Sequence, residues 1–194
     1  MRRSAFISTE LIVVLSVLLV IVGGIIASGL FSKKNVFALL KTFDAVATAQ
    51  TAMNSDTGYY AGESDAVPFP DALLNPSSIT DSTIRQRWRG PYLKTVPTCP
   101  YANCAIDVDF TTGAATNPGE IYQYFITATN VPLEDALELS RKENGDSRVS
   151  ECTESNIANV VTGSQKPCAV YLSTTTGGRN TKVTVYYTFA SGTY

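Results

Sequence analysis

An uncharged, strongly apolar run near the N-terminus constrains this chain more than any other feature of its sequence. The run extends from Leu11 to Ser32, with Glu10 before it and the pair Lys33–Lys34 after it. Its length is about the 20 residues that an α-helix needs to cross the hydrocarbon core of a bilayer. We therefore expect this run to form a membrane-embedded helix.

The charges around the run indicate its orientation. Arg2 and Arg3 favour a cytoplasmic N-terminus, although Lys33–Lys34 on the far side weaken this signal. Residues 1–35 carry four basic residues and one acidic residue, a net +3, whereas the rest carries eleven basic and sixteen acidic residues, a net −5. The acidic body argues against nonspecific binding to duplex DNA, which needs a concentrated basic face.

Three interpretations fit the N-terminal segment. The first is a secretory signal peptide with its exit at residues 27–29, for which the apolar run is rather long and Glu10 is awkwardly placed at its start. A plain signal anchor also leaves Glu10 unexplained, because an ionisable group at the edge of a membrane helix is costly without a partner. A third interpretation accounts for this carboxylate.

Residues 1–5 form a short basic leader that ends in a small residue, and residues 6–10 run from Phe6 to Glu10 into the apolar run. This pattern resembles the N-terminus of a type IV prepilin, although Ala5 stands where glycine is commoner. The resemblance implies cleavage between Ala5 and Phe6 and N-methylation of Phe6. It also implies that Glu10 pairs with the freed amine of a neighbouring subunit during assembly.

The helix is expected to continue beyond the membrane. Apolar residues from Val36 to Ala47 keep a period near 3.6, which predicts one helix over residues 6–54, with residues 6–32 as its membrane or filament core. Gly58 is placed to end it in a left-handed conformation. Residues 55–194 then form a globular exported head, in which the polar segment 63–83 is expected to be a loop lying on the helix.

Two further segments extend the resemblance to about the first 100 residues. An Asp-x-Gly-x-Tyr turn at residues 56–60 and a Gly-Pro-Tyr-Leu segment within residues 88–97 look like those of the major pseudopilin of type II secretion and related pilins. Neither segment is specific alone.

The remaining sequence predicts two β-hairpins and one short helix. Residues 105–110 and 121–127 are rich in alternating or β-branched residues, as are residues 169–174 and 182–189. A helix is expected over residues 132–143, with Asn130 as its cap, a Glu138–Lys142 pair, and Asn144–Gly145 at its end. The expected fold class is α+β, a long N-terminal helix packed on a small antiparallel sheet, as in type IV pilins.

The four cysteines point to disulfides in an exported domain. Pairing of Cys99 with Cys104 and of Cys152 with Cys168 is the simplest of the three connectivities, and the second bond would staple the C-terminal region. A four-thiolate zinc site would need reduced cysteines and usually has tighter spacing.

Three acidic residues, Asp107, Asp109 and Glu120, are candidate calcium ligands, because pseudopilins of the resembled family often hold calcium in this part of the fold. The absence of an Asp-x-Asp-x-Asp-Gly loop favours the simpler interpretation that these acids lie on the solvated face of a strand. We therefore expect no metal site and no cofactor.

One basic cluster contains an aromatic residue: Arg85, Arg87, Trp88 and Arg89. Such a cluster can track a single nucleic-acid strand, but its surroundings are acidic, so that Trp88 is better interpreted as an anchor on the long helix. Nucleic-acid binding is not indicated. Tyrosines 122, 124, 186 and 187 are expected in strands, where exposed rings would allow stacking.

The absence of histidine removes Ser-His-Asp, Cys-His and His-ligated metal arrangements, and the sequence gives no support for an enzyme. The expected function is a pilin subunit of a type IV pilus or pilus-like filament, serving adhesion, motility, DNA uptake or secretion. Its partners would be like subunits, prepilin peptidase, an inner-membrane assembly platform and the membrane. We expect an inner-membrane precursor and then a cell-surface filament, or a periplasmic one for a pseudopilin. The alternative is a monomeric, membrane-anchored or secreted binding domain.

Overall fold

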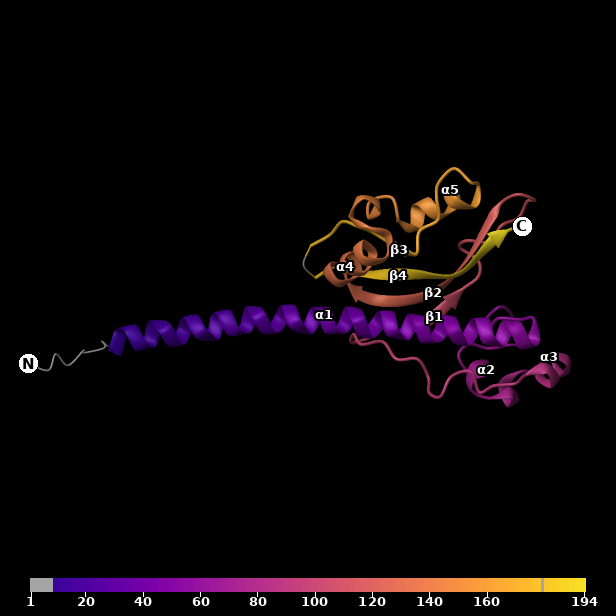
Figure 1. Ribbon diagram of the computed structural model, residues 1–194, viewed down its shortest axis with the longest axis horizontal. Coiled ribbons are helices and arrows are strands. Elements are labelled where there is room, and N and C mark those ends of the chain that lie inside the picture. Colours follow the sequence, from indigo (N-terminus) through magenta and orange to yellow (C-terminus); the bar gives the residue numbers. More distant parts are fainter. Residues whose placement is uncertain (1–8, 179) are drawn as a thin grey trace, which may run out of the picture.

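The computed structural model describes the backbone of residues 9–178 and 180–194, and their side chains from Lys33 onward. The first element is a long helix, α1 (Thr9–Thr57), whose N-terminal half runs out beyond the rest of the protein (Figure 1). Gly58 follows it at φ +80° and donates its N–H to the Asn54 carbonyl over 2.8 Å. This left-handed position ends the helix as expected, slightly later than predicted.

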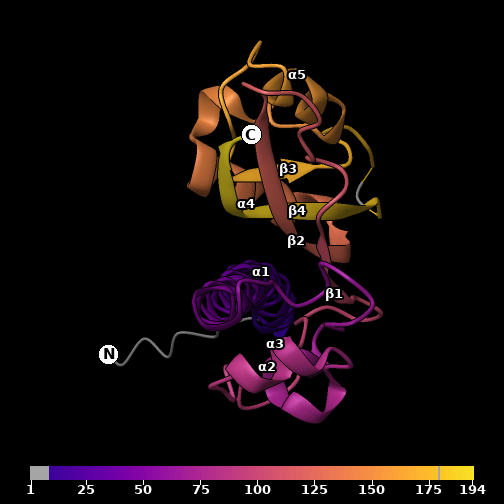
Figure 2. The same cartoon turned by 90° about the vertical axis from the view of Figure 1, so that its right-hand side faces the viewer.

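From Val36 onward, α1 lies between two layers (Figure 2). The sheet and helix α4 (Leu133–Asn144) pack on one side of α1, and the segment that holds helices α2 (Asp71–Leu74) and α3 (Ser82–Arg87) packs on the other. The side chains of α1 that are buried in these two layers are Val36, Leu39, Leu40, Phe43, Val46, Ala49, Gln50, Met53 and Thr57. Their spacing follows the period read from the sequence.

The segment expected as a loop over residues 63–83 lies on α1, but it is not a simple loop. It contains α2 (Asp71–Leu74), the 3₁₀ turn η1 (Pro76–Ser78) and the start of α3 (Ser82–Arg87). The Asp81 carboxylate accepts hydrogen bonds from the N–H groups of Thr83 and Ile84, which caps α3. Side-chain caps of this kind start helices within a polar stretch that has no long apolar period.

Four strands form one antiparallel sheet in the order β1-β2-β4-β3. The strands are β1 (Ile106–Asp109), β2 (Ile121–Pro132), β3 (Val170–Leu172) and β4 (Lys182–Thr193). Pairing of β1 with β2 and of β3 with β4 confirms the two predicted hairpins. The α+β class, with a long helix packed on a small antiparallel sheet, is therefore confirmed.

Helix α4 (Leu133–Asn144) starts and ends close to the predicted bounds, but two of its predicted contacts are wrong. Asn130 does not cap it, because Asn130 adopts φ +55° and its side chain donates to the Asn103 carbonyl over 2.8 Å. The ammonium of Lys142 does not form an ion pair with Glu138 and lies over the ring of Phe37, 5.7 Å from its centroid. Gly145, at φ +84°, follows the helix as expected.

The face of the sheet that points away from α1 is covered by the region between α4 and β3. This region contains the 3₁₀ turns η2 (Asp146–Arg148) and η3 (Glu154–Asn156) and the helix α5 (Ile157–Val161). Its buried cluster consists of Phe125, Cys152, Ile157, Val160, Cys168, Tyr171 and Tyr186. The sheet thus has a core on each face.

Candidate functional site

The three residues that the sequence assigns to processing and assembly lie where no side chain is described. Ala5 and Phe6 precede the described residues, and Glu10 lies in the part of α1 for which only the backbone is described. Their predicted roles in cleavage, N-methylation and subunit pairing therefore stay predictions.

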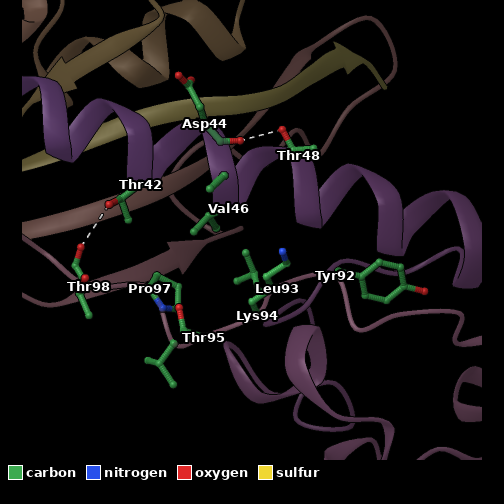
Figure 3. Close-up of a pocket in the computed structure, with 12 residues that line it drawn as sticks. Thr42, Asp44, Val46, Thr48, Tyr92, Leu93, Lys94, Thr95, Pro97 and Thr98 are labelled. Carbon is green, nitrogen blue, oxygen red and sulfur yellow. Dashed lines mark hydrogen bonds between the residues drawn. The ribbon is translucent and has the colours of Figure 1, made fainter.

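A groove of about 550 Å³ separates α1 from the extended segment 92–98 (Figure 3). The Thr42 hydroxyl donates to the Thr98 carbonyl over 3.2 Å at one end of this groove, and the Thr48 hydroxyl donates to the Asp44 carbonyl over 2.8 Å on its α1 wall. The Asp44 carboxylate points away from the groove toward β4, where it accepts a 2.9 Å hydrogen bond from Tyr187. No local pattern in the sequence indicates this groove, because the groove depends on where segment 92–98 passes the helix.

The lining of this groove limits its chemistry. It consists of threonine hydroxyls, aliphatic side chains, the Tyr92 side chain, backbone groups and one lysine, Lys94, whose side chain is exposed. It holds no nucleophile with an adjacent base. The groove can receive a polar side chain or a short extended segment, and it offers no machinery for covalent chemistry.

The two motifs that carried the second half of the resemblance meet in the structure. The Tyr92 hydroxyl donates to Asp56 Oδ2 over 2.9 Å and accepts the Arg89 N–H over 2.9 Å. Burial, opposed by the Arg89 N–H and reinforced by the Asp56 carboxylate, raises the pKa of Tyr92. Tyr92 stays a neutral donor at ordinary pH and holds segment 88–97 against the end of α1.

Trp88 serves as the anchor that the sequence favoured. Its indole N–H donates to the Ala72 carbonyl over 2.9 Å, and its ring packs edge-on to Tyr92 beside the cluster that includes Met53. Arg85, Arg87 and Arg89 are exposed. Among the residues whose side chains are described, none of these arginines makes a cation–π contact with the half-buried indole.

Hydrogen bonds to nearby residues, or exposure to solvent, account for each of the three candidate calcium ligands. Glu120 accepts hydrogen bonds from the side chain of Asn117 and from backbone N–H groups of Thr116 and Asn117, which lower the pKa of Glu120 to about 2. Burial favours a higher pKa for Asp109, but hydrogen bonds from Thr111 and Thr112 outweigh this effect, so the pKa of Asp109 is lowered. Asp107 is exposed, as expected for the solvated face of a strand.

These carboxylates do not converge on one point. Within residues 33–178 and 180–194, no cluster of three cysteine or acidic side chains has an arrangement that could hold a metal ion.

Both disulfides have the local pairing that was the simplest expectation, Cys99 with Cys104 and Cys152 with Cys168. Cys152 and Cys168 are buried in the core on the outer face of the sheet. The first disulfide lies beside the core that α1 shares with the sheet.

Five aromatic rings pack together toward the end of the sheet that lies farthest from the N-terminus. Tyr60, Phe110, Tyr122, Tyr124 and Phe189 form this cluster, with ring centroids 5.0 to 6.4 Å apart in the contacting pairs. Each ring is half-buried by the others. Of the tyrosines expected in strands, Tyr186 is buried on the outer face, and Tyr187 stacks on Phe43 with centroids 5.1 Å apart. The rings mainly contribute to packing.

Comparison of the chain with protein-family models, curated proteins and solved structures finds no match. Among the residues whose side chains are described, no helix has the length and apolar character needed to cross a membrane, and the run from Leu11 to Ser32 lies outside that set.

Proposed function

We propose that this chain is a structural subunit of a type IV pilus or pilus-like filament. In this proposal, prepilin peptidase cleaves the precursor between Ala5 and Phe6 in the inner membrane. An assembly platform there then packs the helices of successive copies into a filament core. The globular part faces solvent and has no catalytic role.

One observation carries the proposal furthest: a single helix leads from the apolar segment into the core of the globular part. Val36, Phe43 and Met53, all on α1, are buried against the sheet or against the α2–α3 segment. A head that is fixed to its helix in this way transmits the position of the packed helix to the filament surface. A monomeric domain that needs only an anchor would be served equally well by a flexible linker.

The sequence of the N-terminus supports the same proposal. The apolar residues 11–32 meet a similar polarity in lipid and in a packed filament. Their burial alone therefore does not determine how far successive subunits are shifted along the filament axis. A carboxylate at Glu10 that pairs with the amine of a neighbouring Phe6 would supply this register. Residues 128–194 exceed a minimal pseudopilin body, which favours a pilus on the cell surface over a periplasmic pseudopilin.

The test is electron microscopy of filaments sheared from cells that express the chain, with mass spectrometry of their subunit. We expect filaments whose subunit begins at an N-methylated Phe6. Glu10→Ala should leave a membrane protein that enters filaments poorly, whereas Asp65→Ala, which removes an exposed carboxylate from the head, should not change the filament yield.

An intact Met1, or a soluble monomer that begins near Leu30, would instead establish the monomeric binding domain. A correctly cleaved subunit that is absent from surface filaments would point to a pseudopilin.

A further inference from the structure

Four exposed lysines and one exposed aromatic ring occur at the end of the globular part from which the N-terminal half of α1 emerges. We call this set the basic collar: Lys33, Lys34, Phe37 and Lys41 of α1, and Lys142 of α4. The Phe37 side chain is 57% exposed, and the ammonium groups of Lys41 and Lys142 lie 6.0 and 5.7 Å from its ring centroid. Figure 1 shows α4 beside α1 at this end of the molecule.

The collar forms because two helices meet there. Lys33, Phe37 and Lys41 are spaced by four residues and therefore share one face of α1. Lys142 comes from the last turn of α4, which packs on α1 through the core that contains Val36 and Leu139. The sequence alone separates Lys142 from the others by about 100 residues.

The positive charge of the collar is not neutralised within the described part of the chain. No carboxylate there forms an ion pair with any of its four lysines. Arg141 is also exposed at this end, but it pairs with Asp146 at 3.9 Å and is not counted in the collar. An exposed aromatic ring among unpaired ammonium groups is an unusual surface for a body whose net charge is −5.

The position of the collar along α1 decides what can cover it. The uncharged run ends at Ser32, so at a rise of about 1.5 Å per residue Phe37 lies about 8 Å and Lys41 about 14 Å beyond the apolar segment. The headgroup region extends roughly 5 to 8 Å beyond each side of the hydrocarbon core, and the Debye length in physiological salt is about 8 Å. The collar therefore lies within or just above the headgroups of a membrane that holds residues 11–32.

We infer that the basic collar binds anionic phospholipid headgroups on the side of the membrane where the globular part lies. The lysines contact lipid phosphates while their aliphatic stems and the Phe37 ring reach toward the acyl boundary. This inference rests on the membrane-embedded precursor of the proposed function. It adds a lipid contact that holds the head against the membrane until assembly removes it.

The experiment measures lysine acetylation, read by mass spectrometry, on the full chain in phosphatidylcholine vesicles with or without phosphatidylglycerol. When phosphatidylglycerol makes up about a third of the lipid, we expect acetylation of Lys34, Lys41 and Lys142 to slow by about threefold or more. The rates at Lys94 and Lys166, exposed residues outside the collar, should not change, and high salt should abolish the protection.

Two variants sharpen this test. Replacing Phe37, Lys41 and Lys142 together (Phe37→Ser, Lys41→Gln, Lys142→Gln) should abolish the protection that remains at Lys34, whereas Lys94→Gln with Lys166→Gln should leave it intact. Equal acetylation in both lipids would overturn the inference, as would protection that follows the protein-to-lipid ratio and therefore reports contact between copies of the chain. If alkaline carbonate extracts the chain from the vesicles, the chain is not embedded in the membrane. That result would contradict the proposed function, and it is distinct from a failure of the lipid contact alone.

Discussion

The Tyr187 hydroxyl donates a 2.9 Å hydrogen bond to Asp44 Oδ1 and so joins β4 to α1 across 143 residues of sequence. The ring of the same tyrosine stacks on Phe43, the neighbour of Asp44 on the helix. Burial, with a further contribution from the Asp44 carboxylate, raises the pKa of Tyr187 to about 12. One side chain therefore attaches the sheet to the helix through an apolar and a polar contact together.

Tyr187→Phe should keep the stacking and remove only the hydrogen bond, at a cost of about 1 to 2 kcal/mol in unfolding free energy because the acceptor is charged. Because the pKa of Tyr187 is higher in the folded state than in the unfolded state, its contribution is complete below about pH 10 and is lost as the pH rises toward about 12. Thermal melts of the detergent-solubilised chain at pH 8 and pH 11 measure both effects. The variant should lose less stability than the wild type between these pH values, and parallel losses would contradict this assignment.

Gln50 is fully buried and holds the backbone of Ala61 on both sides. Its amide donates to the Ala61 carbonyl over 2.9 Å and accepts the Ala61 N–H over 2.8 Å. Gln50→Leu keeps a similar volume but leaves two buried backbone groups unpaired, so we expect a loss of about 2 to 4 kcal/mol in unfolding free energy. Hydrogen exchange at the Ala61 amide should accelerate in parallel.

The matched control for Gln50 is its neighbour Thr51, which is exposed and bonds only to the Ala47 carbonyl of its own helix. Thr51→Ala should change stability by less than about 0.5 kcal/mol. If the two variants prove equally stable, Gln50 does not hold the segment after α1 in place.

Gly58 follows α1 at φ +80°, and a β-carbon added there would meet no atom within 4 Å. Gly58→Ala should therefore cost about 1 to 2 kcal/mol through backbone strain alone. Gly58→Asn should cost less, because asparagine tolerates the left-handed region better than alanine does. Chemical denaturation of the two variants gives the order, and a steric origin would instead make the larger asparagine the worse substitution.

The sequence predicted those elements whose signals are local. The 3.6-residue period from Val36 onward identified α1. Alternation over residues 105–110, and β-branched or aromatic residues next to turn signals elsewhere, identified both hairpins. The glycine that follows each helical pattern, Gly58 and Gly145, likewise indicated where α1 and α4 end. In each case the relevant neighbours lie within one or two turns of the chain.

The errors occurred where a distant partner decides the local structure. Asn130 has the side chain of a helix cap, but it lies within β2 at an irregularity of the strand register, with φ +55° and a hydrogen bond to Asn103 of the first disulfide loop. Lys142 has an acid one turn before it, but the ring of Phe37 lies within its reach. The groove beside Thr42 likewise depends on the path of segment 92–98. No local pattern encodes these three relationships.

The two disulfides close loops of different size in different surroundings, which makes their removal a paired experiment. Cys152 and Cys168 are 16 residues apart and lie in the core that covers the outer face of the sheet, whereas Cys99 and Cys104 are only 5 apart and half-buried. In the chain-entropy model, losing the larger loop costs about 3 kcal/mol and losing the smaller one about 1 kcal/mol less. Replacing Cys152 and Cys168 by alanine also leaves cavities beside Phe125 and Tyr171, which widens the difference in stability between the two variants.

Limited proteolysis should then cut first between Gly145 and Pro167 in the variant that lacks Cys152 and Cys168, while the Cys99→Ala, Cys104→Ala variant keeps this region resistant. Equal protease resistance of the two variants would mean that the α5 region is held by its apolar contacts rather than by its disulfide.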